Sequence, residues 1–225
     1  MRSKSYKQLK EKISEDAMEL LAAAQFLKDN ARAKFDETVE LHIVLGVDAG
    51  KSEQSVRGSV VLPNGTPKQK RVAVFAGDVK KQEEAKQAGA VLVGGDDLIA
   101  DIEKNGISDI DITIATPDMM AKIAKIAKVL GPKGLMPNPR TGTVTPDVGK
   151  AVAELAAGKI SFKMDNQGNV HGAIAKVSWS ADKTEANARA LIEAVRAVRP
   201  ATQRGEFMRK IVLKTSMSPA IRVTL

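Results

Sequence analysis

The sequence predicts an α/β and α+β protein of two domains, one of them inserted into the other. In the middle of the chain, short continuous apolar strands alternate with helical stretches, a pattern typical of a parallel sheet covered on both faces. The flanking parts carry hairpin-type strands instead, and each is too small to bury much core alone. We therefore predict two domains: a discontinuous α+β sandwich with antiparallel strands (1–65 plus 158–225) and an inserted Rossmann-like three-layer α/β domain (66–157).

The N-terminal part is predicted to form helix and then antiparallel strand. Residues 5–30 place apolar side chains on one helical face, and Ser14 followed by Glu15 and Asp16 makes a second helix start possible. In KFDETVELHIVLG (34–46) apolar residues alternate with the others, which predicts a half-buried strand. GSVVLP (58–63) is predicted as a second strand, stopped by its proline.

The middle part is predicted to be strand, helix, strand, helix, strand. The expected strands are RVAVFA (71–76), AVLVG (90–94) and DITIATP (111–117), and the expected helices are 78–88, 96–105, 118–130 and, after a long loop, 146–158. That loop, LGPKGLMPNPRTGTVT (130–145), is too rich in glycine and proline for a helix or a central strand. A phosphate cradle, a nucleic-acid clamp and a stiff connector are all open interpretations of it.

The last part returns to antiparallel strands. KISFKM and NVHGAIAKVSW are predicted strands joined by Asp165-Asn166-Gln167-Gly168, a hairpin turn signal. An amphipathic helix (182–200) and a final strand (208–217) follow. The two chain crossings between the domains, PNGTPKQKR (63–71) and Ala157-Gly158, are expected to act as a paired hinge.

Composition limits the class of protein. Of 225 residues 43% are hydrophobic, which predicts a packed core, and no apolar run approaches the ~20 residues of a membrane span. We expect no membrane partner. The start of the chain lacks an apolar signal region and there is no cysteine, so a cytoplasmic location is expected, without disulfides or thiol chemistry.

Positive charge is concentrated at the C-terminal end. The net charge is +8, and residues 158–225 alone carry twelve Lys or Arg against five Asp or Glu. A localised basic field favours a polyanionic partner. The alternative is the solvated surface of a basic protein, so charge alone favours nucleic acid only modestly.

Enzymatic interpretations find little support. GVDAGKS (46–52) has three residues between its glycines where a phosphate loop needs four, and a strand returns soon afterwards instead of a helix. The inserted domain lacks G-x-G-x-x-G, and Asp96-Asp97 after Gly94-Gly95 would repel a pyrophosphate. We expect no cofactor.

The sequence also offers few candidates for a catalytic site or a metal site. His42 and His171 each lie within a strand pattern and are expected to be structural residues or surface contacts. Asp96-Asp97 suit a helix start, and Asp109 and Asp111 suit a solvated turn. We therefore predict no metal site and no catalytic site.

Two short stretches suit binding to folded RNA. Seven aromatic residues are too few for a single-strand stacking platform, so an RNA partner should be read through backbone, 2′-OH and shape. KFDET (34–38) combines a cation and an aromatic residue with a hydroxyl at a strand start, and KTSMSP (214–219) places three hydroxyls around a methionine. By chemistry alone, RNA contacts and two ordinary loop edges are equally good interpretations.

Five segments carry a resemblance to a known family. These are KFDETVELHIVLGVD, QSVRGSVVLPNGT, RVAVFA, LGPKGLMPNPRTGTVT and NVHGAIAKVSW. Together they resemble the large-subunit ribosomal protein "L-one" family in its bacterial form, collinearly over essentially the whole chain. The resemblance implies a non-enzymatic protein that binds large-subunit (23S-type) rRNA at the mobile stalk near the exit site. It also implies assistance in releasing deacylated tRNA from the exit site and repression of its own operon mRNA. We expect a monomer when it is free of the ribosome.

The resemblance also implies site residues, on the discontinuous domain. The expected rRNA contacts are Lys34, Phe35, Thr38, Ser216, Met217, Ser218 and the adjacent Thr215. Secondary RNA contacts are expected from Lys163, His171, Lys176, Lys133 and Arg140. Ser218 stands where the family usually has glycine, which leaves the local turn geometry open. A general basic RNA-binding protein and a nucleotide-dependent enzyme remain the alternative functions.

Overall fold

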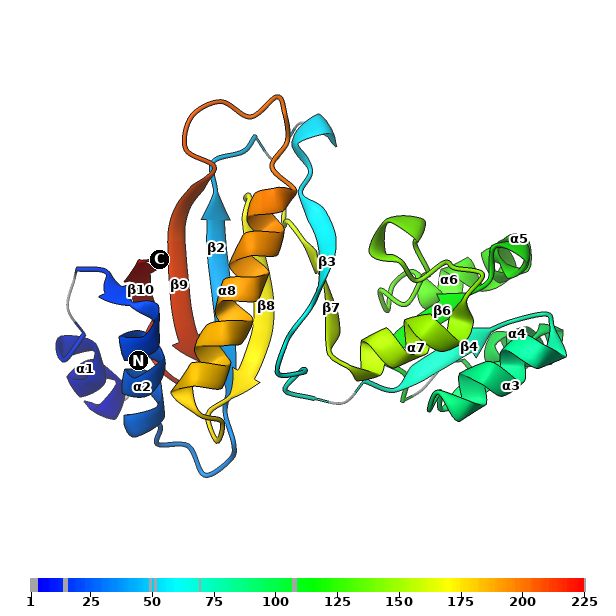
Figure 1. The fold of residues 1–225 in the computed structure, drawn as a ribbon, viewed down its shortest axis with the longest axis horizontal. Helices are drawn as coiled ribbons and strands as arrows, with labels where there is room; N and C mark the ends of the chain where they lie inside the picture. Colours follow the sequence, from blue (N-terminus) through cyan, green and yellow to red (C-terminus); the bar gives the residue numbers. More distant parts are fainter. Residues whose placement is uncertain are drawn as a thin grey trace. The chain divides into compact units, whose positions relative to one another are not determined.

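The computed structural model describes residues 4–13, 16–48, 50, 52–68, 70–106 and 109–224, without the side chains of Ser5, Ser52, Asn105 and Arg140. The chain divides into two compact units (Figure 1). Unit 1 comprises Met1–Pro67 and Ile160–Leu225, and unit 2 comprises Lys68–Lys159. Mixed α/β architecture with separate antiparallel and parallel sheets confirms the predicted fold class.

Unit 1 is built on a five-stranded sheet in the order β1-β10-β9-β2-β8 (Figure 1). Its strands are β1 (Met18–Glu19), β2 (Thr38–Leu45), β8 (Asn169–Lys176), β9 (Met208–Thr215) and β10 (Ile221–Thr224). The central strand β2 pairs antiparallel with both β8 and β9. A separate two-stranded sheet joins β3 (Arg57–Val61) to β7 (Lys159–Lys163).

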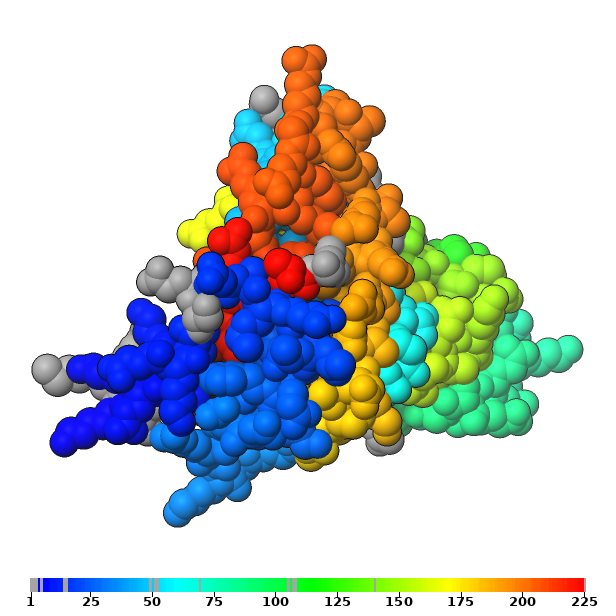
Figure 2. All heavy atoms as spheres, turned by 60° about the vertical axis from the view of Figure 1, so that its left-hand side comes forward, coloured from blue at the N-terminus to red at the C-terminus, as the bar shows by residue number. Residues whose placement is uncertain are grey.

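Two helices cover one face of the large sheet. Val39, Leu41, Ile43 and Leu45 of β2 are buried, as their alternation predicts, and they share a core with α2 (Leu20–Asp29) and α8 (Ala181–Ala197). These helices lie side by side in Figure 2, α2 in blue and α8 in gold to orange. Ser180 caps α8 by accepting a hydrogen bond from the Lys183 N–H. The opposite face of the sheet therefore carries the polar residues of the alternation.

The N-terminal part forms two helices, the possibility that the sequence left open, with a short strand between them that was not predicted. A short helix α1 (Lys4–Glu11) comes first, then β1, and α2 begins only at Leu20. Ser14 and Glu15, the proposed inner helix start, lie outside the described residues. The chain forms β1 because Met18 pairs in parallel with Val223 of β10, a long-range contact that helical periodicity does not reveal.

The C-terminal part also differs. The 165–168 turn forms, with Gly168 at φ 83°, yet β7 and β8 share only one isolated bridge, Met164 to Val170. The hairpin ladder expected between these two strands was wrong, because β8 pairs along its length with β2 while β7 pairs with β3. Strand β10 was missed because it has only four residues directly after a proline-containing turn.

Unit 2 contains a parallel sheet in the order β5-β4-β6. The strands are β4 (Val72–Phe75), β5 (Leu92–Gly94) and β6 (Ile112–Ala115). One face packs against α3 (Val79–Gln87) and α7 (Val148–Ala156). The other packs against α4 (Asp96–Asn105) and the helical segment 117–130. Both faces are covered, which gives the three layers predicted.

The segment 117–130 is not one continuous helix. It consists of η2 (Pro117–Met119), α5 (Met120–Ile123), η3 (Ala124–Ile126) and α6 (Ala127–Leu130). Tighter 3₁₀ turns alternate with α turns here, although no glycine or proline follows Pro117 within the segment. Local sequence therefore gave no warning of the interruption.

The glycine- and proline-rich loop 130–145 extends the parallel sheet at its β6 edge. The Ala115 N–H donates to the Thr143 carbonyl (2.9 Å), and the Thr145 N–H donates to the Ala115 carbonyl (3.1 Å). The side chain of Leu135 is 8% exposed, and the Thr113 hydroxyl donates to the Leu135 carbonyl. The loop thus satisfies and covers backbone groups that an edge strand would expose.

Candidate nucleic-acid interface

Antiparallel pairing brings the two stretches chosen from the sequence to the same edge of unit 1. The start of β2 lies beside the ends of β8 and β9, at the lower end of the sheet in Figure 1, since Thr38 pairs with Lys176 and Val39 with Thr215. We call the seven residues gathered here the strand-end cluster: Lys34, Phe35, Thr38, Thr215, Ser216, Met217 and Ser218. Residues that are about 180 positions apart in the sequence are thereby brought into direct contact.

A buried carboxylate ties the two halves of the cluster together. The side chain of Glu37 is 2% exposed. Its Oε2 accepts hydrogen bonds from the Thr215 hydroxyl (2.6 Å) and the Met217 N–H (2.9 Å). Its Oε1 accepts from the Ala33 N–H (3.3 Å). A buried carboxylate is tolerated because these donors replace water, and in return it fixes three backbone segments.

The turn after β9 is closed by its own hydroxyls. The Thr215 N–H donates to Ser218 Oγ (2.8 Å), and the Ser218 N–H donates to Thr215 Oγ1 (3.2 Å). The Ser218 hydroxyl donates in turn to the Pro219 carbonyl (2.9 Å). Across the strands, the Thr38 N–H donates to Ser216 Oγ (3.3 Å). The turn is therefore built from polar bonds, with little apolar packing.

Serine at position 218 fits this turn without strain. Among the described residues, Asp109 is the one non-glycine with a positive φ, so Ser218 does not adopt the left-handed conformation that favours glycine. Its side chain supplies two of the bonds that close the turn. The geometry left open by the sequence is thus resolved: the hydroxyl stabilises the turn.

The loop before β2 is fixed from a second direction. The Asp36 carboxylate accepts from the Ser178 N–H (3.1 Å) and the Ser178 hydroxyl (2.9 Å). Lys176 Nζ donates to the Asp36 carbonyl (3.1 Å) and to Thr38 Oγ1 (3.0 Å). Lys176 thus contacts the cluster directly, and its ammonium group lies within the loop network.

Two large apolar side chains project from this rigid base. The exposed fraction is 57% for Phe35 and 65% for Met217, and Lys34 is also exposed. Thr215, in contrast, is 1% exposed. Exposed apolar side chains gathered beside a cation are typical of a surface that a partner covers.

The open face of the five-stranded sheet carries cations next to this cluster. One cross-strand row contains Arg222, Val212, His42 and His171, and the next pairs Lys214 with Glu40. Lys214 Nζ lies 3.7 Å from Glu40 Oε2. The helices pack on the other face, so this basic face can approach a polyanion directly.

Glu37 was missed by the sequence-based selection, although a signal existed. Residues 37, 39, 41, 43 and 45 share one parity of β2, and the last four are its core residues. Period-2 alternation extended by one step places Glu37 on the buried face. An acidic residue at a position that the alternation places on the buried face is therefore the sequence signal for this carboxylate, which we call the Glu37 clamp.

The secondary candidates are scattered. Lys163 is exposed on β7 and His171 lies on β8, both in unit 1. Lys133 is exposed in unit 2, in the loop that covers β6. The side chain of Arg140 lies outside the described residues. Within unit 1, Lys163 and His171 lie outside the strand-end cluster.

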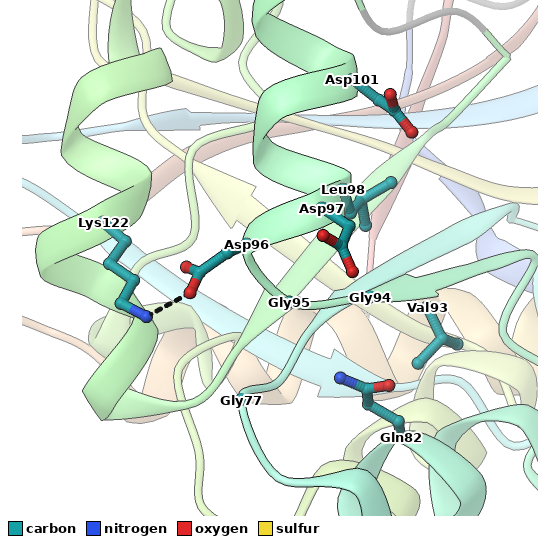
Figure 3. A pocket seen from close by; sticks show the side chains of 10 residues that line it. All are labelled: Gly77, Gln82, Val93, Gly94, Gly95, Asp96, Asp97, Leu98, Asp101 and Lys122. Atoms are coloured by element: carbon teal, nitrogen blue, oxygen red, sulfur yellow. Dashed lines mark hydrogen bonds and ion pairs between the residues drawn. The ribbon is translucent and has the colours of Figure 1, made fainter.

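A pocket at the carboxyl ends of β4 and β5 is the place where a nucleotide would bind in a Rossmann-like unit (Figure 3). Asp96, Asp97 and Asp101 line it, and Asp96 forms an ion pair with Lys122 (2.7 Å). Three carboxylates oppose a phosphate here. Across the part of the chain that the structure describes, no three His, Asp or Glu side chains converge as metal ligands.

The other enzyme-like motifs have structural partners. Asp109 pairs with Arg71 (2.9 Å), and Asp111 pairs with Lys68 (3.0 Å); the Arg71 N–H and Lys68 lower the pKa of Asp111. In GVDAGKS, Ala49 and Lys51 lie outside the described residues, and Ser52–Gln54 forms one 3₁₀ turn. Within the described ranges, no helix has the length and apolarity to cross a membrane.

A rigid, hydroxyl-rich corner beside an open basic sheet face is the arrangement expected of a nucleic-acid-binding protein. Residues 27–219 match the Ribosomal protein L1p/L10e family, and the chain belongs to this family. It is 47% identical over 224 residues to "Large ribosomal subunit protein uL1" of Fervidobacterium nodosum, covering 99% of this chain and 95% of that protein. The protein of the same name from Solibacter usitatus is 46% identical over 221 residues, with coverages of 98% and 92%. The resemblance and the prediction of a non-enzymatic protein are thereby confirmed.

Proposed function

We propose that the protein binds large-subunit (23S-type) rRNA through the strand-end cluster and the adjoining open face of the sheet. The observation that carries this proposal is the Glu37 clamp, which holds Phe35 and Met217 together as exposed side chains on a polar base. Both relatives are named as proteins of the large ribosomal subunit, which supports rRNA as the polyanion.

Each part of the cluster suits one component of folded RNA. Thr38 and Ser216 present short polar groups that can approach 2′-hydroxyls and phosphates closely. Lys34 adds charge for a phosphate, and Lys214 on the open face does the same. Phe35 and Met217 pack against ribose or an unstacked base and displace water there.

Thr215 and Ser218 act in this proposal chiefly as positioning residues. The Thr215 hydroxyl donates a hydrogen bond to the Glu37 carboxylate, and Thr215 is almost fully buried. The Ser218 hydroxyl closes the turn. Ser218 can still offer backbone groups to RNA. Lys176 likewise holds the loop through Asp36 and Thr38, and its charge adds to the local field.

The finer functions rest on the family. We propose that unit 1 is the rRNA-binding domain and that its target is the mobile stalk near the exit site. Unit 2 swings while unit 1 holds the RNA, and the protein assists the release of deacylated tRNA. Secondary contacts from Lys163, His171, Lys133 and Arg140 belong to this proposal. So do repression of the protein's own operon mRNA, a monomeric state off the ribosome and a cytoplasmic location on the large subunit.

A competition assay tests the proposal. Full-length protein, labelled stalk rRNA fragment and unlabelled competitor are mixed at physiological salt, and the competitor is either the stalk fragment or random RNA of equal length. Stalk RNA should compete at least a hundredfold better, because a shaped cluster adds specific contacts to the charge term. Equal competition would show a general polyanion binder, the second candidate, which the basic C-terminal third favours.

A further inference from the structure

The two histidines of the chain face each other on the open sheet face. The sequence contains only His42 and His171, and they are direct cross-strand partners in β2 and β8. Their Nδ1 atoms are 2.6 Å apart, and the rings meet edge to face, with centroids 4.9 Å apart. Two imidazoles so placed direct one nitrogen each at a common point.

A carboxylate lies against the outer nitrogen of each ring. His171 Nε2 is 3.3 Å from Asp165 Oδ2, and His42 Nε2 is 3.3 Å from Glu40 Oε2. Asp165 also accepts the N–H groups of Gln167 (2.8 Å) and Asn169 (2.7 Å), so its carboxylate is held in place beside His171. The acceptor at His171 Nε2 favours the proton on that nitrogen and leaves the lone pair of His171 on Nδ1, whereas His42 Nε2 is buried and makes no hydrogen bond.

Two Nδ1 atoms at this distance are joined either by a hydrogen bond, in which one ring carries the Nδ1 proton, or by a cation between two lone pairs. A proton is one option. A cation that binds neutral imidazole is the other option, and metal-ligating histidines usually donate their other ring N–H to a carboxylate, as His171 Nε2 is placed to do toward Asp165.

We propose that His42 and His171 bind one divalent transition-metal ion of the zinc type between their Nδ1 atoms. Zn–N distances of ~2.0–2.1 Å with a tetrahedral angle separate the nitrogens by roughly 3.3 Å, so small side-chain rotations open the pair to fit. The side chains are 24% and 51% exposed, which gives the ion an entry path and room for water as its remaining ligands. Imidazole selects Zn²⁺, Ni²⁺ or Cu²⁺ over Mg²⁺.

The charges around the site are mixed. The carboxylates of Glu40 and Asp165 offset the positive charge of the ion and favour its binding. Lys214, beside Glu40, is positively charged and disfavours it. No third protein ligand converges there in the described part of the chain, so the proposed site is an open one with two protein ligands. The proposal does not depend on RNA binding.

Tag-free full-length protein is titrated with zinc chloride at pH 7.5, by calorimetry and by NMR of the imidazole protons. One equivalent should bind, both histidine spin systems should shift together, and magnesium chloride should have no effect. His42→Ala and His171→Ala should each lower zinc affinity at least tenfold. Asp165→Asn should lower it about 10- to 100-fold, as loss of an orienting carboxylate does.

Glu193→Gln provides the matched control. It removes an exposed carboxylate from α8, on the other side of the sheet, and should leave zinc affinity within twofold of wild type. Absence of zinc binding up to millimolar concentration would overturn the proposal. Binding that survives both histidine substitutions would also overturn it. So would NMR data in which the pair takes up a single shared proton and no metal.

Discussion

Replacement of Glu37 tests the clamp that assembles the cluster. Glu37→Ala removes both carboxylate oxygens from a site that is 2% exposed and leaves three donors without partners: the Thr215 hydroxyl and the N–H groups of Met217 and Ala33. Hydrogen bonds to charged groups contribute about 1.5–3 kcal/mol each. Counting the two shorter bonds fully and the 3.3 Å bond weakly, we expect a loss of about 3–5 kcal/mol in the free energy of unfolding.

Glu37→Gln provides the graded comparison. The amide oxygen can still accept from Thr215 and Met217, while the amide NH₂ must then face the Ala33 N–H, so a loss of about 1–2 kcal/mol is expected. Trp179, the only tryptophan, packs against the core of unit 1, so its fluorescence during urea unfolding reports this unit. A Glu37→Ala protein within 1 kcal/mol of wild type, or less affected than Glu37→Gln, would refute the clamp.

Three further outcomes are expected. Asn187→Ala should cost unit 1 about 2–4 kcal/mol, measured by the same fluorescence, because the fully buried amide donates to the Ile174 and Gly65 carbonyls. Asp165→Asn should unfold at lower urea than wild type at pH 7. Because the folded pKa of Asp165 is lowered, this gap should close as pH falls below about 4, and a constant gap would contradict the cause given. Lys214→Ala should weaken stalk and random RNA alike and reduce the salt dependence of binding by about one ion; an unchanged slope would remove Lys214 from the interface.

Much of the architecture follows from local patterns. Alternation in β2 predicted its buried face, and continuous apolar strands separated by helices predicted the parallel sheet of unit 2. What failed depended on long-range pairing. Strand β1 exists because of β10, and the loop 130–145 is an edge cover because Ala115 offers it backbone groups. Such partners are distant in sequence and leave no local period.

The candidate site could be predicted from the sequence only in part, because its key contacts also join distant segments. Exposed Phe35 and Met217 were selected by chemistry and family resemblance, whereas the Glu37 bonds to Thr215 and Met217 span about 180 residues. Only the parity of Glu37 with the core residues of β2 indicated burial, and nothing local indicated its partners. Selection of the facing histidines as a pair likewise needed the β2–β8 register.

The most direct test of the central claim compares two variants in stalk rRNA affinity at physiological salt. Met217→Asp places an acid in the strand-end cluster, and Val79→Asp makes the same charge change in unit 2 at a side chain of matched exposure, 66% against 65%. Repulsion from phosphate should lower the affinity of Met217→Asp at least tenfold and leave that of Val79→Asp within about twofold of wild type. Equal affinities for the two variants would contradict the placement of the RNA site.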